Sequence, residues 1–310
     1  MRMGEKVVTK DEILQEKELY WKSVLFFAAF SNHLRIKKIK HKIEHKIDGS
    51  DRNPKYPDFI LLENEEVTNI LEHKASLPLN QEFALKILEE TSQKYSKISY
   101  KGKEYDPTVV MLCPITCEEV IKKIKKLNKT NVLICIFNLN IEDCEISFIL
   151  NGDKYPKLIK EILSEEIPCR NDDFSKYKFI KKEPHPVYTS WVIWSIILNY
   201  FKDPYTIKKE SIIVRYELLI EQASTLFPNW IDDAHQMSKY RVNEALIFLN
   251  KISFVNWSIG GSEIEFFHTK GSRVGDIFDY FAKMWVKIEK LKPKKKISPK
   301  QKGLEEFLNR

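Results

Sequence analysis

The sequence predicts an α/β protein in two parts, a mixed α/β half followed by a mostly helical half. The chain has 310 residues, enough for about two domains of roughly 150 residues each. Its first half alternates strand-like and helix-like apolar spacing, which is typical of a mixed sheet flanked by helices. Hydrophobic residues make up 43% of the chain, so a globally disordered protein is excluded.

The first half holds most of the expected strands. In residues 39–47 every second residue is charged, with Lys40, Lys42, Glu44 and Lys46 on one side, which predicts a strand with a basic face. In chain order, we expect a helix at 10–33, strands at 39–47, 56–62 and 67–76, a helix at 81–98, a strand at 107–114, a helix at 117–130 and strands at 131–140 and 145–152. We therefore assign residues 1–165 to one domain.

The second half is expected to be mainly helical. Residues 166–186 are rich in Pro, Asn, Asp and Lys, so they are expected to form a linker. Gly260-Gly261 separates two apolar segments, which is typical of a hairpin. We expect helices at 187–201, 208–226 and 239–251, two strands within 254–269 and a helix at 274–291. A helical domain at 187–292 and a basic tail at 293–310 complete the predicted organisation.

Charge and cysteine content bear on partners and compartment. Residues 287–302 contain eight Lys and one Glu, which accounts for the net charge of +7. Such a tail favours a polyanionic partner, or is a solvated tail with no partner. Five Cys and a charged N-terminal segment without an apolar core predict a cytoplasmic, intracellular protein. The apolar run at 187–201 is short and interrupted, so no membrane partner is expected.

Three charged residues on two consecutive expected strands are the candidates for a catalytic site. Asp58 begins one expected strand, and Glu72 and Lys74 lie on the next. Residues two apart on a strand point to the same face, so Glu72 and Lys74 project together. If the strands are neighbours, Asp58 joins Glu72, and two carboxylates with water and phosphate oxygens suit Mg²⁺. The alternative is an ordinary ion pair on a half-exposed strand.

Pro57-Asp58 followed by Glu72-His73-Lys74 resembles the PD-(D/E)XK nuclease superfamily. The resemblance covers about residues 10–150, including the expected element order, and implies a restriction-endonuclease-like mixed sheet flanked by helices. It implies that Asp58, Glu72 and the carbonyl of His73 bind Mg²⁺ or Mn²⁺ and that Lys74 is the catalytic lysine. The function implied is a metal-dependent DNA endonuclease.

The resemblance also implies an acid on the leading helix and substrate contacts on the following helix. Glu18 is the preferred helix acid, with Glu16 and Glu44 as alternatives. Gln93-Lys94-Tyr95 departs from the Gln-x-x-x-Tyr element of exonuclease-related members, but Gln93 and Lys97 remain candidates for substrate contact.

Residues 211–270 resemble a winged helix-turn-helix domain by their pattern of helices followed by two strands. The resemblance implies that part of the third helix faces DNA and that residues after the wing bind phosphate: Lys239, Tyr240, Arg241 and Asn243, then Lys270 and Arg273. Plain packing or protein contact is the alternative use. The expected partners are DNA and either a second copy of the chain or a partner subunit.

The biological role stays open. Restriction or phage defence, junction resolution and the cleaving subunit of a heteromeric transposase are all compatible with this layout. The alternative of a different class is a non-catalytic DNA-binding regulator or scaffold, and a third possibility is an RNA substrate.

Overall fold

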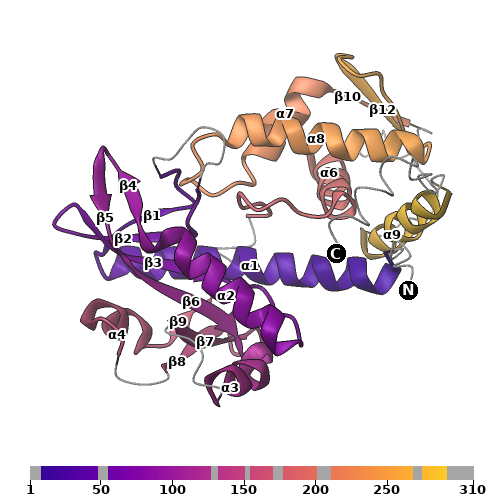
Figure 1. The fold of residues 1–310 in the computed structure, drawn as a ribbon. Helices are drawn as coiled ribbons and strands as arrows, with labels where there is room; N and C mark the ends of the chain where they lie inside the picture. The colour runs from indigo at the N-terminus through magenta and orange to yellow at the C-terminus, as the bar shows by residue number, and fades with distance from the viewer. Residues whose placement is uncertain are drawn as a thin grey trace, which may run out of the picture.

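The computed structural model describes residues 8–47, 55–126, 132–150, 154–169, 177–200, 211–267 and 274–291. Helix α1 (Lys10–Ile36) is 27 residues long and reaches from the sheet to the helices of the second half (Figure 1). Thr9 and Glu12 form a capping box at its start, which satisfies backbone N–H groups that the helix leaves free. The C-terminal part of α1 is apolar and buried.

Among the described residues, seven strands form the main sheet, which is mixed. In spatial order they are β1 (Lys40–Ile43), β2 (Phe59–Glu63), β3 (Glu66–His73), β6 (Thr108–Pro114), β7 (Leu133–Asn140), β8 (Glu145–Leu150) and β9 (Ile167–Pro168). Strands β3, β6 and β7 run parallel to one another, and the other neighbours are antiparallel. The α/β class and the mixed sheet expected from the sequence are therefore confirmed.

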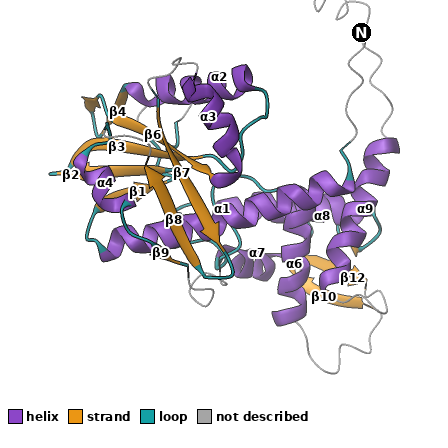
Figure 2. Cartoon of the chain, turned by 90° about the horizontal axis from the view of Figure 1, so that it is seen from below, coloured by secondary structure: helices purple, strands orange, loops and turns teal. Residues whose placement is uncertain are grey.

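Helices cover both faces of this sheet (Figure 2). Helices α2 (Gln81–Ser96) and α3 (Glu118–Lys126) pack on one face, where Ile60 and Ile70 are buried. Helices α1 and α4 (Lys157–Leu163) pack on the other, where Phe59 and Leu71 are buried. Each such side chain contributes about 1.5–3 kcal/mol when fully buried, so strands β2 and β3 are fixed from both sides.

Short elements join this framework. Asn64 and Glu65 both have positive φ, 52° and 68°, as expected for a tight two-residue turn between β2 and β3. The hairpin of β4 (Ile98–Tyr100) and β5 (Lys103–Tyr105) and the short helix η1 (Ile115–Cys117) were not expected from the sequence.

The second half contains α6 (Pro186–Tyr200), β10 (Ser211–Arg215), α7 (Tyr216–Ser224), α8 (Ala234–Lys251), β11 (Val255–Asn256), β12 (Glu263–Phe267) and α9 (Val274–Leu291). Its three strands form a sheet in the order β10-β12-β11. The helix predicted at 208–226 is wrong over 211–215, where Ile212 and Val214 are buried and Ile213 is 63% exposed. That alternation is the period of a strand, paired here with β12.

Part of the predicted linker lies in the hydrophobic core. Phe179 and Ile180 are 0% and 1% exposed, and a single cluster of buried side chains includes residues from α1, from the main sheet and from α6, α7 and α8. The two halves therefore share a core in the described structure. None of the described helices is long and apolar enough to span a membrane.

Candidate active site

Strand pairing brings Asp58 beside Glu72. The antiparallel register pairs Phe59 with Leu71, so the residue before β2 lies opposite the penultimate residue of β3. The Asp58 backbone N–H donates to Glu72 Oε1 at 3.1 Å, and the His73 N–H donates to Asp58 Oδ2 at 2.7 Å. Each carboxylate is thus oriented by the backbone of the other strand, as expected if the two strands were neighbours.

The two carboxyl groups are held in a setting that opposes their negative charge. Burial, followed by the carboxylates of Glu72 and Glu44, raises the pKa of Asp58 well above its usual value. Burial also raises the pKa of Glu72, against the lowering effect of Lys74. Burying charge without enough compensation is unfavourable, so this pair is suited to receive a cation.

Lys74 follows the last residue of β3 and points at the acid pair. Its backbone N–H donates to the carbonyl of Leu112 on β6 at 2.8 Å, so the chain stays paired beyond the strand. Its Nζ lies 3.7 Å from Glu72 Oε2, and the two side chains are 19% and 8% exposed. Partly shielded from water, this cation can neutralise charge on a bound anion.

Glu44 is a further acid that lines the same pocket as Asp58 and Glu72. The strand predicted at 39–47 ends at Ile43, because Glu44 has a left-handed backbone with φ of 46°. That turn carries the side chain from the expected basic face into the interior, where it is 4% exposed. The Lys181 backbone N–H donates to its Oε2 at 3.0 Å. Of Glu18, Glu16 and Glu44, it is Glu44 that lines the same pocket as Asp58 and Glu72.

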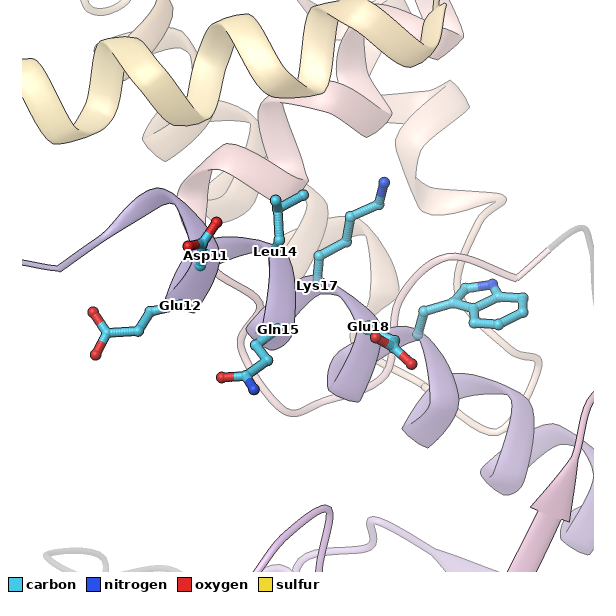
Figure 3. Close-up of a pocket in the computed structure, with 7 residues that line it drawn as sticks. Asp11, Glu12, Leu14, Gln15, Lys17 and Glu18 are labelled. Carbon is cyan, nitrogen blue, oxygen red and sulfur yellow. The ribbon is translucent and has the colours of Figure 1, made fainter. Parts of the chain in front are cut away.

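The expectation that Glu18 supplies this acid is wrong. Glu18 is 61% exposed and forms an ion pair with Lys22 on the same helix at 2.6 Å. It lies in a separate hollow near the start of α1, with Asp11, Glu12, Leu14, Gln15 and Lys17 (Figure 3). Glu16 is exposed on the same part of α1. The part of α1 that packs on the sheet is apolar instead.

His73 contributes both its backbone N–H, which donates to Asp58, and its ring, as a residue that lines the pocket. Its ring packs against Phe26 and Phe137, with centroids 4.7 and 5.4 Å apart. Burial, with smaller effects of Lys182 and Lys74, lowers the pKa of His73 to about 3. The ring is therefore neutral at physiological pH and adds no cation to the acid pair.

On α2, Tyr95 rather than Gln93 reaches the site. Tyr95 is 1% exposed, and its hydroxyl lies 3.2 Å from the Tyr56 carbonyl and within hydrogen-bonding reach of the Glu72 carboxylate. Gln93 and Lys97 are exposed and do not line the pocket. Tyr95 shares the buried side of α2 with Ala84 and Leu88, a helical spacing that could have identified it from the sequence.

Asp58, Glu72 and Lys74 line a cavity of about 630 Å³ to which both halves contribute. The first half supplies Glu44, Tyr56, Asp58, Glu72, His73, Lys74, Ala75 and Ser76, and the second half with its preceding segment supplies Lys181, Lys182, Asp233 and Met237. The sequence does not point to Lys181 and Lys182 as pocket residues, because they lie in a Pro- and Lys-rich stretch that predicts a linker.

The donor set fits a Mg²⁺ or Mn²⁺ ion of the kind that keeps most of its water. Mg²⁺ commonly uses one or two carboxylates together with substrate phosphates, and Asp58 and Glu72 supply two adjacent ones. Within the described part of the chain, however, no three His, Cys, Asp or Glu side chains are gathered closely enough to hold a metal by themselves. Any metal here would therefore depend on water and substrate oxygens.

The predicted DNA-facing residues of α8 fall into two groups. Lys239 and Tyr240 are exposed, whereas the expectation for Arg241 is wrong, because Arg241 is 3% exposed and shares the inward side of the helix with Ser238 and Val242. Asn243 is half-buried and accepts a hydrogen bond from the Tyr216 hydroxyl at 2.6 Å. Lys270, Arg273 and the basic tail at 293–310 lie outside the described residues.

Arg241 instead holds backbone carbonyls. Its Nη2 lies 2.6, 3.2 and 3.1 Å from the carbonyl oxygens of Ile180, Lys181 and Lys182. Its guanidinium packs over the rings of Phe179 and Phe227, at 4.9 and 4.8 Å from their centroids. A buried guanidinium with this many partners fixes a structure and is not available to DNA.

No family model matches this chain, and searches of curated proteins and of solved structures return no match. The resemblance to the PD-(D/E)XK nucleases therefore stays a prediction.

Proposed function

We propose that the chain is a metal-dependent phosphodiester hydrolase whose active site is the pocket around Asp58, Glu72 and Lys74. Within that class, we propose a DNA endonuclease. The observation that carries the proposal is the convergence of two carboxylates and a lysine in a single pocket. Each carboxylate accepts a backbone N–H from the paired strand, and the lysine lies 3.7 Å from one of them. An ordinary ion pair would not need a second buried acid beside it.

Each residue has a role in this reaction. When bound, Mg²⁺ or Mn²⁺ supplies Lewis-acid chemistry to the phosphate and to the attacking water. Asp58 and Glu72 would hold the metal ion. The backbone of the opposite strand fixes one oxygen of each carboxylate, so both carboxylates have a defined orientation. Lys74 neutralises charge that develops on the scissile phosphate or orients the water. Tyr95 holds Glu72 in place. The expected products carry 5′-phosphate and 3′-hydroxyl ends.

Several features support the finer assignments of fold. The order α1, β1 to β3, α2, β6, α3, β7 agrees with the element order expected for a restriction-endonuclease-like domain. In the described part of the second half, helices α6, α7 and α8 precede the β11–β12 hairpin, and β10 completes its sheet, which is compatible with a winged helix. Of the four α8 residues expected to face DNA, Lys239 and Tyr240 are exposed and remain candidates for contact.

A cleavage assay on supercoiled plasmid tests this function. Wild type is compared with Asp58→Asn, and Asp106→Asn serves as the matched control because Asp106 is exposed and outside the pocket. We expect Mg²⁺- or Mn²⁺-dependent nicking by wild type and Asp106→Asn, and none by Asp58→Asn. Plasmid that is retarded but never cut would instead favour the DNA-binding regulator.

A further inference from the structure

The segment between the two halves delivers two lysines to the nuclease pocket. On the basis of the nuclease function above, we propose that Lys181 and Lys182 form a phosphate-binding pair, which holds the DNA backbone next to Asp58 and Glu72. Both lysines line the pocket, although more than 100 residues separate them from these acids in the chain. The catalytic pocket would then be composite, incomplete without the second half.

The first half fixes the backbone of this segment, which we call the strap (residues 177–185). The Ile180 N–H donates to the Tyr20 hydroxyl on α1 at 3.1 Å, and the Lys181 N–H donates to Glu44 Oε2 at 3.0 Å. Tyr20 and Glu44 are 5% and 4% exposed, so both contacts are shielded from water. Their positions in the first half therefore determine where the strap enters the pocket.

The second half fixes the same backbone from the other side. Arg241 on α8 donates to the carbonyls of Ile180, Lys181 and Lys182. The Tyr188 hydroxyl on α6 donates to the Lys178 carbonyl at 3.1 Å. A backbone held in this way does not need to be ordered again when a ligand binds, which favours binding by the side chains it carries.

The two lysine side chains are placed for an anion that enters the pocket. Lys181 is 24% exposed; its Nζ lies 3.8 Å from Asp233 Oδ1, at the limit of an ion pair, and 4.8 Å from the centre of the Tyr56 ring. Lys182 is exposed, and its charge contributes to lowering the pKa of His73. A lysine ammonium binds phosphate as a compact point charge, so neither side chain requires a specific geometry.

The charge of the pocket explains why such a pair is needed. Among the described residues, four carboxyl groups line it, those of Glu44, Asp58, Glu72 and Asp233, and Lys74 is the lysine that the first half supplies. A DNA backbone approaching that set would be repelled before any cleavage. Lys181 and Lys182 bring the lining close to balance and place the added positive charge on the side of the pocket formed by the strap.

The test compares two double variants of the full chain. Lys181→Gln/Lys182→Gln removes the pair, and Lys123→Gln/Lys126→Gln removes two exposed lysines of α3 that do not line the pocket. Binding to a fluorescent DNA duplex is measured by anisotropy in Ca²⁺ over a range of salt concentrations, and cleavage of the same duplex is measured in Mn²⁺. Thermal unfolding checks that both variants fold.

We expect the strap variant to lose about 1–2 from the slope of log K against log salt, since each phosphate contact contributes about 0.9. Its cleavage rate at low substrate should fall by at least about 10-fold, the effect of losing a charge-assisted contact. The α3 variant should match wild type in cleavage. If wild type cuts and the strap variant has the same slope and rate, the phosphate-binding pair is overturned while the nuclease stands. If wild type neither binds nor cuts DNA, the nuclease function itself fails.

Discussion

Arg241 and Glu44 hold the two sides of one peptide segment. Glu44 Oε2 accepts the Lys181 N–H at 3.0 Å, and Arg241 Nη2 lies 3.2 Å from the Lys181 carbonyl oxygen. Glu44 belongs to the first half and Arg241 to the second, and both are nearly inaccessible to solvent. These two contacts with Lys181 couple the helical half to the pocket. The first two predictions rest on them.

Replacement of Arg241 should destabilise the protein strongly. In Arg241→Met, the carbonyls of Ile180, Lys181 and Lys182 lose a charged donor, and Glu44 loses a nearby cation. We expect a loss of about 3 kcal/mol in the free energy of unfolding, measured by urea denaturation. Lys239→Met, two residues away on the exposed side of α8, should stay within about 0.5 kcal/mol of wild type. Equal stability of the two variants would contradict the structural role of Arg241.

Glu44 rather than Glu18 should matter for cleavage. Glu44→Gln keeps the size of a side chain that orients the strap and faces Asp58, but removes its charge. We expect its turnover to fall by about 10-fold or more, measured as the rate of plasmid nicking. Glu18→Gln should cut like wild type, because Glu18 is exposed and paired with Lys22. The reverse ranking of the two variants would restore the original expectation for Glu18.

The acid pair predicts an effect of pH on stability in metal-free solution. The folded-state pKa of Asp58 is raised above its unfolded value by burial and by neighbouring carboxylates. The folded state therefore binds more protons than the unfolded state, and stability falls as pH rises above the ordinary carboxyl pKa. Asp58→Asn should consequently be more stable than wild type at pH 7, on the order of 1 kcal/mol, and the gap should close on acidification.

Thermal unfolding with EDTA at pH 5 and pH 7 measures this gap. Asp106→Asn is the control, since Asp106 is exposed and its replacement should not stabilise the protein at pH 7. If wild type is more stable than Asp58→Asn at pH 7 without metal, the charge of Asp58 does not destabilise the folded protein, and the prediction is contradicted.

Divalent metal should reverse the order of stability of wild type and Asp58→Asn, so that wild type becomes the more stable protein. A ligand that binds only the folded state stabilises it by RT ln(1 + [L]/Kd), about 2.7 kcal/mol at a concentration of 100 Kd. We expect Mn²⁺ to raise the melting temperature of wild type and to leave Asp58→Asn and Glu72→Gln unchanged. A similar rise in all three proteins would place the metal elsewhere.

Tyr95 should act through the position of Glu72. Tyr95→Phe removes the hydroxyl that reaches Glu72 and the Tyr56 carbonyl and keeps the buried ring. Turnover should fall by roughly 5- to 30-fold, the equivalent of a lost hydrogen bond of about 1–2 kcal/mol. Gln93→Ala, two residues earlier and exposed, should have little effect, and a larger loss there than in Tyr95→Phe would support Gln93 as a substrate contact.

The core of the site could be predicted from the sequence because it depends on local patterns. Asp58 and Glu72 lie on consecutive strands joined by a short turn, so antiparallel pairing brings them together with little dependence on the rest of the fold. Lys74 follows from the two-residue period of a strand. The same patterns predicted most helices and strands of the first half.

The remaining residues of the site could not be predicted, because their positions depend on contacts between distant parts of the chain, which local sequence patterns do not reveal. A single left-handed residue turns Glu44 inward, against the alternation that placed it on an exposed face. Arg241 looks like a DNA contact in the sequence, but its helical position directs it to the strap. Tyr20, Glu44 and Arg241 hold the backbone around Lys181 and Lys182, and these residues are far apart in the chain.

The central claim is that the pocket of Asp58, Glu72 and Lys74 cuts DNA. The most direct measurement is the rate at which wild type and Lys74→Ala nick supercoiled plasmid in Mn²⁺, with DNA binding by both proteins measured in Ca²⁺. We predict that Lys74→Ala still binds DNA and that its nicking rate is lower by on the order of 100-fold or more. Equal nicking by the two proteins, or nicking by wild type that persists in EDTA, would contradict the claim.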